Sequence, residues 1–69
     1  MAVHLKAARV NAGFTQAEVV TELRGKGYKI SKNTLVSYEL YRTMPDIETA
    51  KALATLYGMT VDNIIFFKK

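Results

Sequence analysis

Polar side chains that can bind the edges of DNA bases lie close together in the segment SKNTLVSYEL, residues 31–40. Ser31 is a residue type that caps helices, so a helix is expected to start at Lys32. One side of that helix then carries Lys32, Asn33, Val36, Ser37 and Leu40. Asparagine can bond adenine bidentately, lysine can donate to guanine, serine suits either, and an aliphatic group can contact the thymine methyl. The segment therefore holds the side chains needed to read bases in a major groove.

The composition is typical of one small folded domain without covalent cross-links. The chain has 69 residues, enough for a single domain over 1–69, and 49% of them are apolar, which argues against disorder. Cysteine is missing, so disulfides and thiolate zinc ligands are excluded. The N-terminus lacks the apolar stretch of a signal peptide, and the longest aliphatic and aromatic run, IIFF, is far below the roughly 20 residues of a membrane span. We therefore expect a cytoplasmic protein that does not contact a membrane.

Positive charge is concentrated in the stretch RGKGYKISK, residues 24–32. The net charge of the chain is +4, and this stretch has four basic residues and no acidic one. The acidic residues gather elsewhere, for example at Glu18 and Asp46. A basic cluster beside a helix start is what a phosphate-binding surface needs. A solvated loop is the alternative, and composition alone does not separate the two.

Apolar residues recur at helical spacing over most of the chain, whereas strand-like alternation is nearly absent. This pattern predicts a first helix over about residues 3–12, which Gly13 ends. Thr15 and Glu18 have the spacing of a capping box, so a second helix is expected over about 16–24.

Three further helices are predicted after the glycine-rich segment RGKGYKI. The third starts after Ser31 and ends at about residue 40 or 41. The fourth starts at residue 45 or 46, because proline disfavours helix just before it, and ends at Tyr57. Thr60 caps a short fifth helix over about 61–66. The sequence therefore predicts an all-α, five-helix domain.

The second and third helices, joined by a loop and flanked by two others, have the arrangement of a helix-turn-helix, whose second helix enters the major groove. Several motifs follow in a characteristic order: Leu5, Ala8-Arg9, GFTQAEV (13–19), SKNTLVSYE (31–39), Pro45 and LATLYGMTVDNI (53–64). In order and spacing the chain resembles the Cro/CI-type (XRE) family of phage and bacterial repressors over nearly its whole length. The resemblance implies a lambda-repressor-like DNA-binding domain with its helix-turn-helix at helices 2 and 3.

The resemblance also implies roles for individual positions. Gln16 corresponds to the glutamine whose side chain and backbone N–H hold a phosphate. The positions that read bases, which supply specificity, are Lys32, Asn33 and Ser37, with Val36 adjacent. The positions near the sugar-phosphate backbone, which fix the register, are Thr34, Tyr41, Arg42 and Thr43.

One charged pair has a structural role by the same resemblance. Glu39 lies on the inward side of the third predicted helix, together with Leu35 and Tyr38. Arg9 and Glu39 match a family pair that forms a partly buried ion pair between helices one and three. Removing one partner would leave the other charge uncompensated.

Three departures from the family pattern concern the same helices. The segment RGKGYKI replaces a short turn of the LGVS kind, which either swings helix three or brings Lys26, Tyr28 and Lys29 to the phosphates. Val20 replaces the usual small alanine and suggests a wider helix pair. Tyr41 replaces a common glycine, so either helix three runs on or this side chain lies flat against the backbone.

Nothing in the sequence indicates an enzyme. His4 is the only histidine, and without cysteines or a second histidine it cannot build a metal site. Ser31 and Ser37 have no histidine within motif range, and Gly25 and Gly27 lack the strand and GKS/GKT motif of a nucleotide-binding loop. We expect no metal, no cofactor and no small-molecule ligand, and a double-stranded DNA operator as the partner.

The C-terminal residues 64–69 are a candidate dimerisation segment. The apolar side chains of 64–67 cannot all face inward on one short helix, and exposed apolar patches commonly mark interfaces. We expect Ile65, Phe66 and Phe67 to form the self-association surface of a homodimer, at least on DNA. The alternative is a tail folded back over the core of its own monomer.

Two functions are compatible with these features. The first is a sequence-specific transcriptional regulator, a Cro-like or short repressor that occludes a promoter by binding an operator. The second is a protein-binding helix-turn-helix module of the antirepressor or antitoxin-like kind. The basic stretch 24–32 favours DNA, whereas the aliphatic Val36 and Leu40 on the outer side of helix three favour a protein partner.

Overall fold

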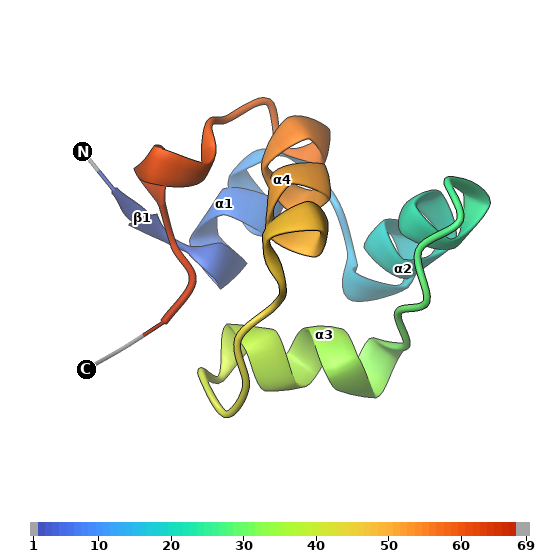
Figure 1. Ribbon diagram of the computed structural model, residues 1–69. Helices are drawn as coiled ribbons and strands as arrows, with labels where there is room; N and C mark the ends of the chain where they lie inside the picture. Colours follow the sequence, from blue (N-terminus) through green and yellow to red (C-terminus); the bar gives the residue numbers. More distant parts are fainter. Residues whose placement is uncertain (1, 68–69) are drawn as a thin grey trace.

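The computed structural model describes residues 2–67 and contains four α-helices and a pair of short strands. In chain order the elements are β1 (Val3–His4), α1 (Leu5–Asn11), α2 (Gln16–Gly25), α3 (Lys32–Glu39), α4 (Ile47–Leu56), the 3-10 turn η1 (Val61–Asn63) and β2 (Ile64–Ile65). Figure 1 shows α3 along one side of the molecule, with the other helices stacked above it. The outer side of α3 is therefore free to meet a partner.

The starts of the central helices follow from local capping bonds. Thr15 and Glu18 form the reciprocal capping box, with Glu18 N–H donating to Thr15 Oγ1 over 3.1 Å and Thr15 N–H donating to Glu18 Oε1 over 2.8 Å. Ser31 Oγ accepts from the Thr34 N–H over 3.1 Å and starts α3 at Lys32. Both starts agree with the sequence prediction.

The four α-helices end in the same way, with a residue of positive φ directly after the cap. Gly13, Gly27 and Gly58 occupy this position after α1, α2 and α4, with φ of 84°, 93° and 71°. After α3 it is Tyr41, with φ of 60°. The next amide donates back to the carbonyl five residues earlier, as in the Schellman motif. The alternative in which α3 runs on through Tyr41 is therefore wrong.

The prediction of an all-α, five-helix domain needs correction at both chain ends. Residues 61–66 form a single 3-10 turn followed by β2 rather than a fifth helix, and α1 begins at Leu5 because the two residues before it form β1. The strands pair in parallel, with Val3 opposite Ile64. Ile64 in β2 and Phe66 just after it are buried, at 5% and 7% exposure, whereas Ile65 between them is half-buried.

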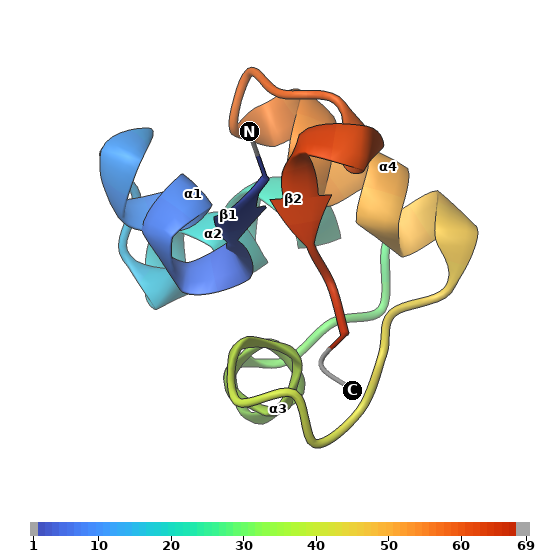
Figure 2. The same ribbon diagram turned by 90° about the vertical axis from the view of Figure 1, so that its left-hand side faces the viewer.

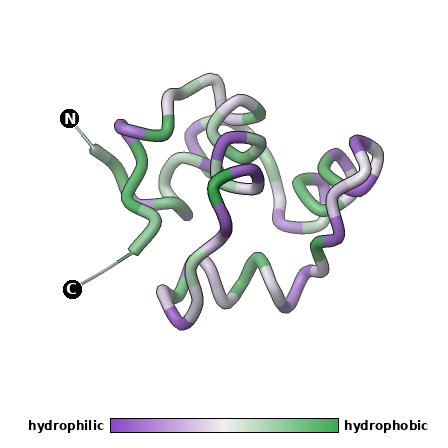
Figure 3. Tube along the Cα trace, in the orientation of Figure 1, coloured by the Kyte–Doolittle hydropathy of each residue, from purple (hydrophilic) through white to green (hydrophobic). Residues whose placement is uncertain are grey.

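The core lies between the helices and extends to the paired strands. Its fully buried side chains are Leu5, Val19, Leu23, Leu35 and Leu53. Val20 packs against this core and is partly buried at the α2–α3 pair. Figure 3 shows a hydrophobic stretch at the C-terminal end of the chain running beside the N-terminal strand, so both chain ends contribute apolar surface to the fold.

Candidate nucleic-acid interface

The outer side of α3 presents the side chains that the sequence assigns to base reading. Lys32 and Asn33 are exposed, and Val36 and Ser37 are half-buried where the helix turns toward the body of the protein. Leu40 directly follows the helix and is 56% exposed. An α-helix about 10–12 Å across fills a major groove about 12 Å wide, so this exposed side can reach base edges.

A buried polar network holds α3 against α1 and α2. Arg9 Nε donates to Glu39 Oε2 over 2.7 Å, and the side chains of these two residues are 9% and 3% exposed. A second guanidinium nitrogen, Nη1, donates to the carbonyl of Phe14 over 2.8 Å. Gln16 Nε2 donates to Glu39 Oε1 over 3.0 Å, which ties the first residue of α2 to the last residue of α3. The orientation of the two helices is thus set by hydrogen-bonded charges as well as by packing.

Gln16 has two further N–H groups at the start of α2, one in its backbone and one in its side chain. As the first residue of α2, its backbone N–H has no partner within the helix. One N–H of its side-chain amide is also free after the bond to Glu39. Both groups are suited to an anion near the positive end of the α2 dipole.

The side chains of the loop after α3 point in two directions. Arg42 and Thr43 are exposed on the surface beside the C-terminal end of α3. The hydroxyl of Tyr41 instead donates to the Ile65 carbonyl over 3.1 Å and lies 2.8 Å from His4 Nδ1. Tyr41 was predicted to contact the DNA backbone, but its hydroxyl is bound within the protein.

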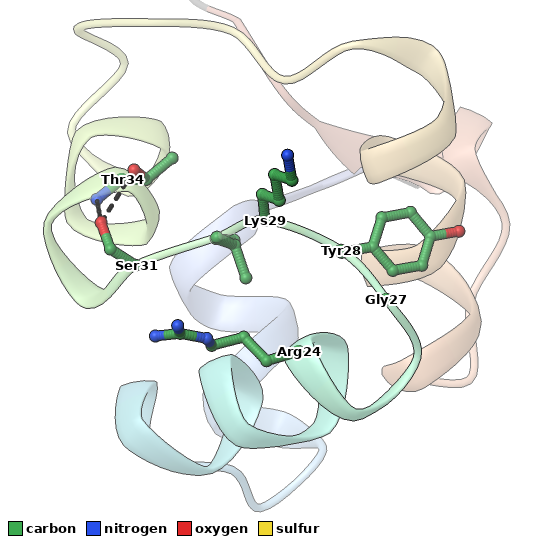
Figure 4. Close-up of a pocket in the computed structure, with 7 residues that line it drawn as sticks. Arg24, Gly27, Tyr28, Lys29, Ser31 and Thr34 are labelled. Atoms are coloured by element: carbon green, nitrogen blue, oxygen red, sulfur yellow. Dashed lines mark hydrogen bonds between the residues drawn. The ribbon is translucent and has the colours of Figure 1, made fainter.

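The long α2–α3 connection surrounds an open cavity of about 610 Å³ at the start of α3 (Figure 4). Its lining residues are Arg24, Gly27, Tyr28, Lys29, Ile30, Ser31 and Thr34. Arg24 extends along the edge of α2 toward Ser31, while Lys29 points to the other side of the loop. Among the described residues, two basic side chains and no acidic one line the cavity, so its potential is expected to be positive.

The two lysines of this connection, Lys26 and Lys29, line different cavities. Lys26 lies by a second cavity, of about 200 Å³, together with Lys51 of α4. Tyr28 lies between the two cavities and points toward α4 in Figure 4. Lys29 and Arg24 both line the cavity at the start of α3, from opposite sides of the connection, although the sequence assigns no contact to Arg24 on its own. Arg24 belongs to the run of basic residues that indicates a phosphate-binding surface in the sequence, but only the fold places it at the start of α3.

Two acidic residues near these helices, Glu18 and Asp46, form capping hydrogen bonds. Hydrogen bonds from Thr15 lower the pKa of Glu18, and hydrogen bonds from Thr49 lower the pKa of Asp46. Within residues 2–67, the only ion pair joins Arg9 and Glu39. The basic side chains beside α3 thus keep their charge for an external partner.

The chain matches the family model described as Helix-turn-helix over residues 5–64, which includes all four helices. The chain belongs to the helix-turn-helix family. It is of the XRE type, the class of the Cro and CI regulators, as the sequence predicts. Comparison with curated proteins and with solved structures gives no match.

This helix-turn-helix regulator has its DNA-binding pair in α2 and α3, and the family assigns it a DNA-binding regulatory role. Within residues 2–67 no helix is both long and apolar enough to cross a bilayer. The same part of the chain contains no group of three or more histidine, cysteine, aspartate and glutamate side chains that could hold a metal.

Apolar side chains of the regulator are exposed on the side that bears the C-terminal strand. Met44, Ile47 and Phe67 are 63%, 58% and 58% exposed. They border a cavity of about 270 Å³ whose wall includes Phe66. Phe66 was expected on a self-association surface, yet its side chain is buried in its own monomer, and Ile65 is half-buried. Of the candidate segment 64–69, residues 68 and 69 lie outside the described part of the chain.

Proposed function

We propose that this regulator binds a specific operator in double-stranded DNA by placing α3 in the major groove. The observation that carries the proposal is the side of α3 on which Lys32 and Asn33 are exposed, on a helix fixed by the Arg9–Glu39 pair. Lysine and asparagine are side chains that discriminate guanine and adenine by their hydrogen-bonding edges. Ser37 and Val36 lie one turn further along the same side and extend the readout.

Contacts with the phosphates flank this helix in the proposed complex. Gln16 offers a free backbone N–H at the start of α2, and Arg42 and Thr43 are exposed beyond the other end of α3. Thr34 and Lys29 border the cavity at the start of α3, where Arg24 adds a third donor. Because α3 fills the groove, the rows of phosphates must pass along its flanks. Lys26, on the α4 side of the loop, contributes through its charge at longer range.

A repressor role and a two-fold dimer complete the proposal. Two half-sites about 34 Å apart would place two α3 helices in successive major grooves, so that a promoter overlapping the operator is occluded. The apolar cavity bordered by Met44, Ile47 and Phe67 is the surface we assign to a second copy of this chain. Two of its lining residues, Met44 and Ile47, come shortly after the loop that follows α3.

A protein-binding module is the competing function, and Leu40 is the residue that favours it. This side chain is 56% exposed at the end of α3, where an aliphatic group suits a protein contact better than a phosphate. Salt dependence separates the two functions, since DNA binding should weaken with a log–log slope near −0.9 for each neutralised phosphate.

The test of the proposed function is selection of bound duplexes from a random-sequence pool at physiological salt. Enrichment of a palindrome is expected, with a spacing between half-sites that reports the dimer geometry. A bound pool without any enriched sequence would contradict operator recognition, and no bound pool at all would favour the protein-binding alternative.

A further inference from the structure

Tyr41 occupies the position after the helix cap that glycine occupies in the other three helices. The position after the helix cap is glycine in α1, α2 and α4, because glycine adopts positive φ without steric cost. Tyr41 adopts φ of 60° at the same position after α3. A bulky residue keeps such a conformation only where surrounding contacts hold it there.

The contacts that hold Tyr41 come from both ends of the chain. Its hydroxyl donates to the carbonyl of Ile65 in β2 over 3.1 Å. The same oxygen lies 2.8 Å from His4 Nδ1 and accepts from the Leu5 N–H over 3.4 Å. Because the hydroxyl proton goes to Ile65, the contact with His4 is a hydrogen bond in the tautomer that carries a proton on Nδ1. The His4 and Tyr41 rings lie 5.8 Å apart, centroid to centroid. One hydroxyl thus joins β1, the start of α1 and β2.

The backbone of Tyr41 leads into the loop that the proposed function places beside DNA. Its N–H donates to the Tyr38 carbonyl over 3.1 Å, and the N–H of the next residue, Arg42, donates to the Ser37 carbonyl over 2.9 Å. These bonds set the direction in which Arg42 and Thr43 leave the helix. Figure 2 shows the C-terminal segment descending from β2 toward α3 and this loop.

We propose that Tyr41 is a positioning residue that couples the pairing of β1 and β2 to the placement of the Arg42–Thr43 loop on DNA. This inference rests on the proposed function. Loss of the strand pairing lowers DNA affinity, and DNA binding in turn stabilises the strand pair by the same factor, because coupling between two equilibria is reciprocal.

The test is a double-mutant cycle of Tyr41→Phe and His4→Ala, read out as affinity for the selected duplex and for a random-sequence duplex. We expect Tyr41→Phe to weaken both complexes about fivefold, the equivalent of one hydrogen bond. Tyr41→Gly, which restores the residue type of the other helix ends, is expected to fold and to weaken both complexes similarly. In the His4→Ala background, Tyr41→Phe should have a clearly smaller effect.

Tyr38→Phe is the matched control, since it removes a tyrosine hydroxyl from α3 itself that has no protein partner among residues 2–67. Its affinity is expected to equal that of the unmodified protein. If Tyr41→Phe weakens binding equally with and without His4, the contact between Tyr41 and β1 does not carry the effect, and the proposed coupling to the pairing of β1 and β2 is overturned.

A second readout keeps the inference separate from the proposed function. If the unmodified protein bound no duplex, operator recognition would fail, while the coupling could still be measured by amide hydrogen exchange at Arg42. Tyr41→Phe is expected to accelerate that exchange severalfold, because the amide's bond to Ser37 loses its support. Unchanged exchange at Arg42 would overturn the coupling itself.

Discussion

Asn33 offers the most specific hydrogen-bonding pattern on the outer side of α3. Its amide carries a donor and an acceptor together, which matches the paired groups that adenine exposes in the major groove. Lys32 beside it carries only hydrogen-bond donors. It can therefore bind an acceptor on more than one base and distinguishes bases less sharply. At the scale of single residues, discrimination between sequences should therefore depend most on Asn33.

Asn33→Ala is expected to weaken binding to the selected duplex by about 1–3 kcal/mol and to leave binding to random duplex nearly unchanged. Competition titrations of the two duplexes at one salt concentration measure this difference. Asn63→Ala, at the 3-10 turn η1, removes an asparagine away from α3 and serves as the control. Equal weakening on both duplexes would mean that Asn33 does not read bases.

At the scale of elements, the α2–α3 connection is the part that distinguishes this helix-turn-helix from one with a short turn. It places Arg24 and Lys29 around the cavity at the start of α3, on the flank where a row of phosphates would pass. In the proposed complex the connection would add phosphate contacts, while the helix pair stays fixed by Glu39 and its two partners.

Arg24→Met is expected to reduce the magnitude of the log–log salt slope by about 0.9, the value for one phosphate contact. Lys51→Met removes the same charge from α4 and should lower affinity less, with little change of slope. Fluorescence anisotropy over a series of salt concentrations measures both. A slope that changes equally in the two variants would show that only net charge matters.

The caps of α2 and α4 predict how stability depends on pH. Folding lowers the pKa of Glu18 through hydrogen bonds from the backbone and side chain of Thr15, and it lowers the pKa of Asp46 through hydrogen bonds from the side chain and backbone of Thr49. Their contribution is present above the unfolded pKa of about 4 and is lost as pH falls through the lower folded pKa. The free energy of unfolding should therefore decrease in acid.

Asp46→Asn is expected to flatten this acid dependence while keeping helix α4, since asparagine also caps helices well. Urea unfolding followed by circular dichroism between neutral and acidic pH measures the effect. Asp62→Asn, which removes a carboxylate from the 3-10 turn, is the comparison. An unchanged pH profile for Asp46→Asn would rule out the capping bond as its source.

At the scale of the whole molecule, two neighbouring phenylalanines have different roles. One packs in the core, and the other lies on the surface that we assign to association. Phe66 is 7% exposed and belongs to the core, whereas Phe67 is 58% exposed beside Met44 and Ile47. Exposed apolar patches commonly mark interfaces, so we assign this surface to contact with a second copy of the chain.

Phe67→Ser is expected to shift the protein toward monomer with little loss of stability, while Phe66→Ala costs about 3–5 kcal/mol of unfolding free energy. Sedimentation velocity over a dilution series measures the first effect and urea unfolding the second. If the unmodified chain sediments only as a monomer at high concentration and binds DNA as one, the assignment of this surface to a second copy is wrong.

The sequence by itself determined the features that depend on neighbours a few positions apart. Capping by Thr15 and Ser31 located the starts of α2 and α3, because these bonds span only three residues. Helical periodicity placed Lys32 and Asn33 on the exposed side of α3 and Leu35 in the core. Together with the motif order, this was enough to predict a helix-turn-helix, which the family match confirms.

Only the tertiary structure decided the features that join distant parts of the chain. Residues 64–65 are a strand because β1 lies beside them, and no local pattern specifies that partner. The hydroxyl of Tyr41 meets His4, 37 positions away, so its inward direction was not readable from the residue type. The side of the loop on which Arg24 lies depends likewise on how α2 packs against α3. Local bonds fix where helices begin, whereas the placement of a side chain on one surface or another depends on which distant segment fills the space beside it.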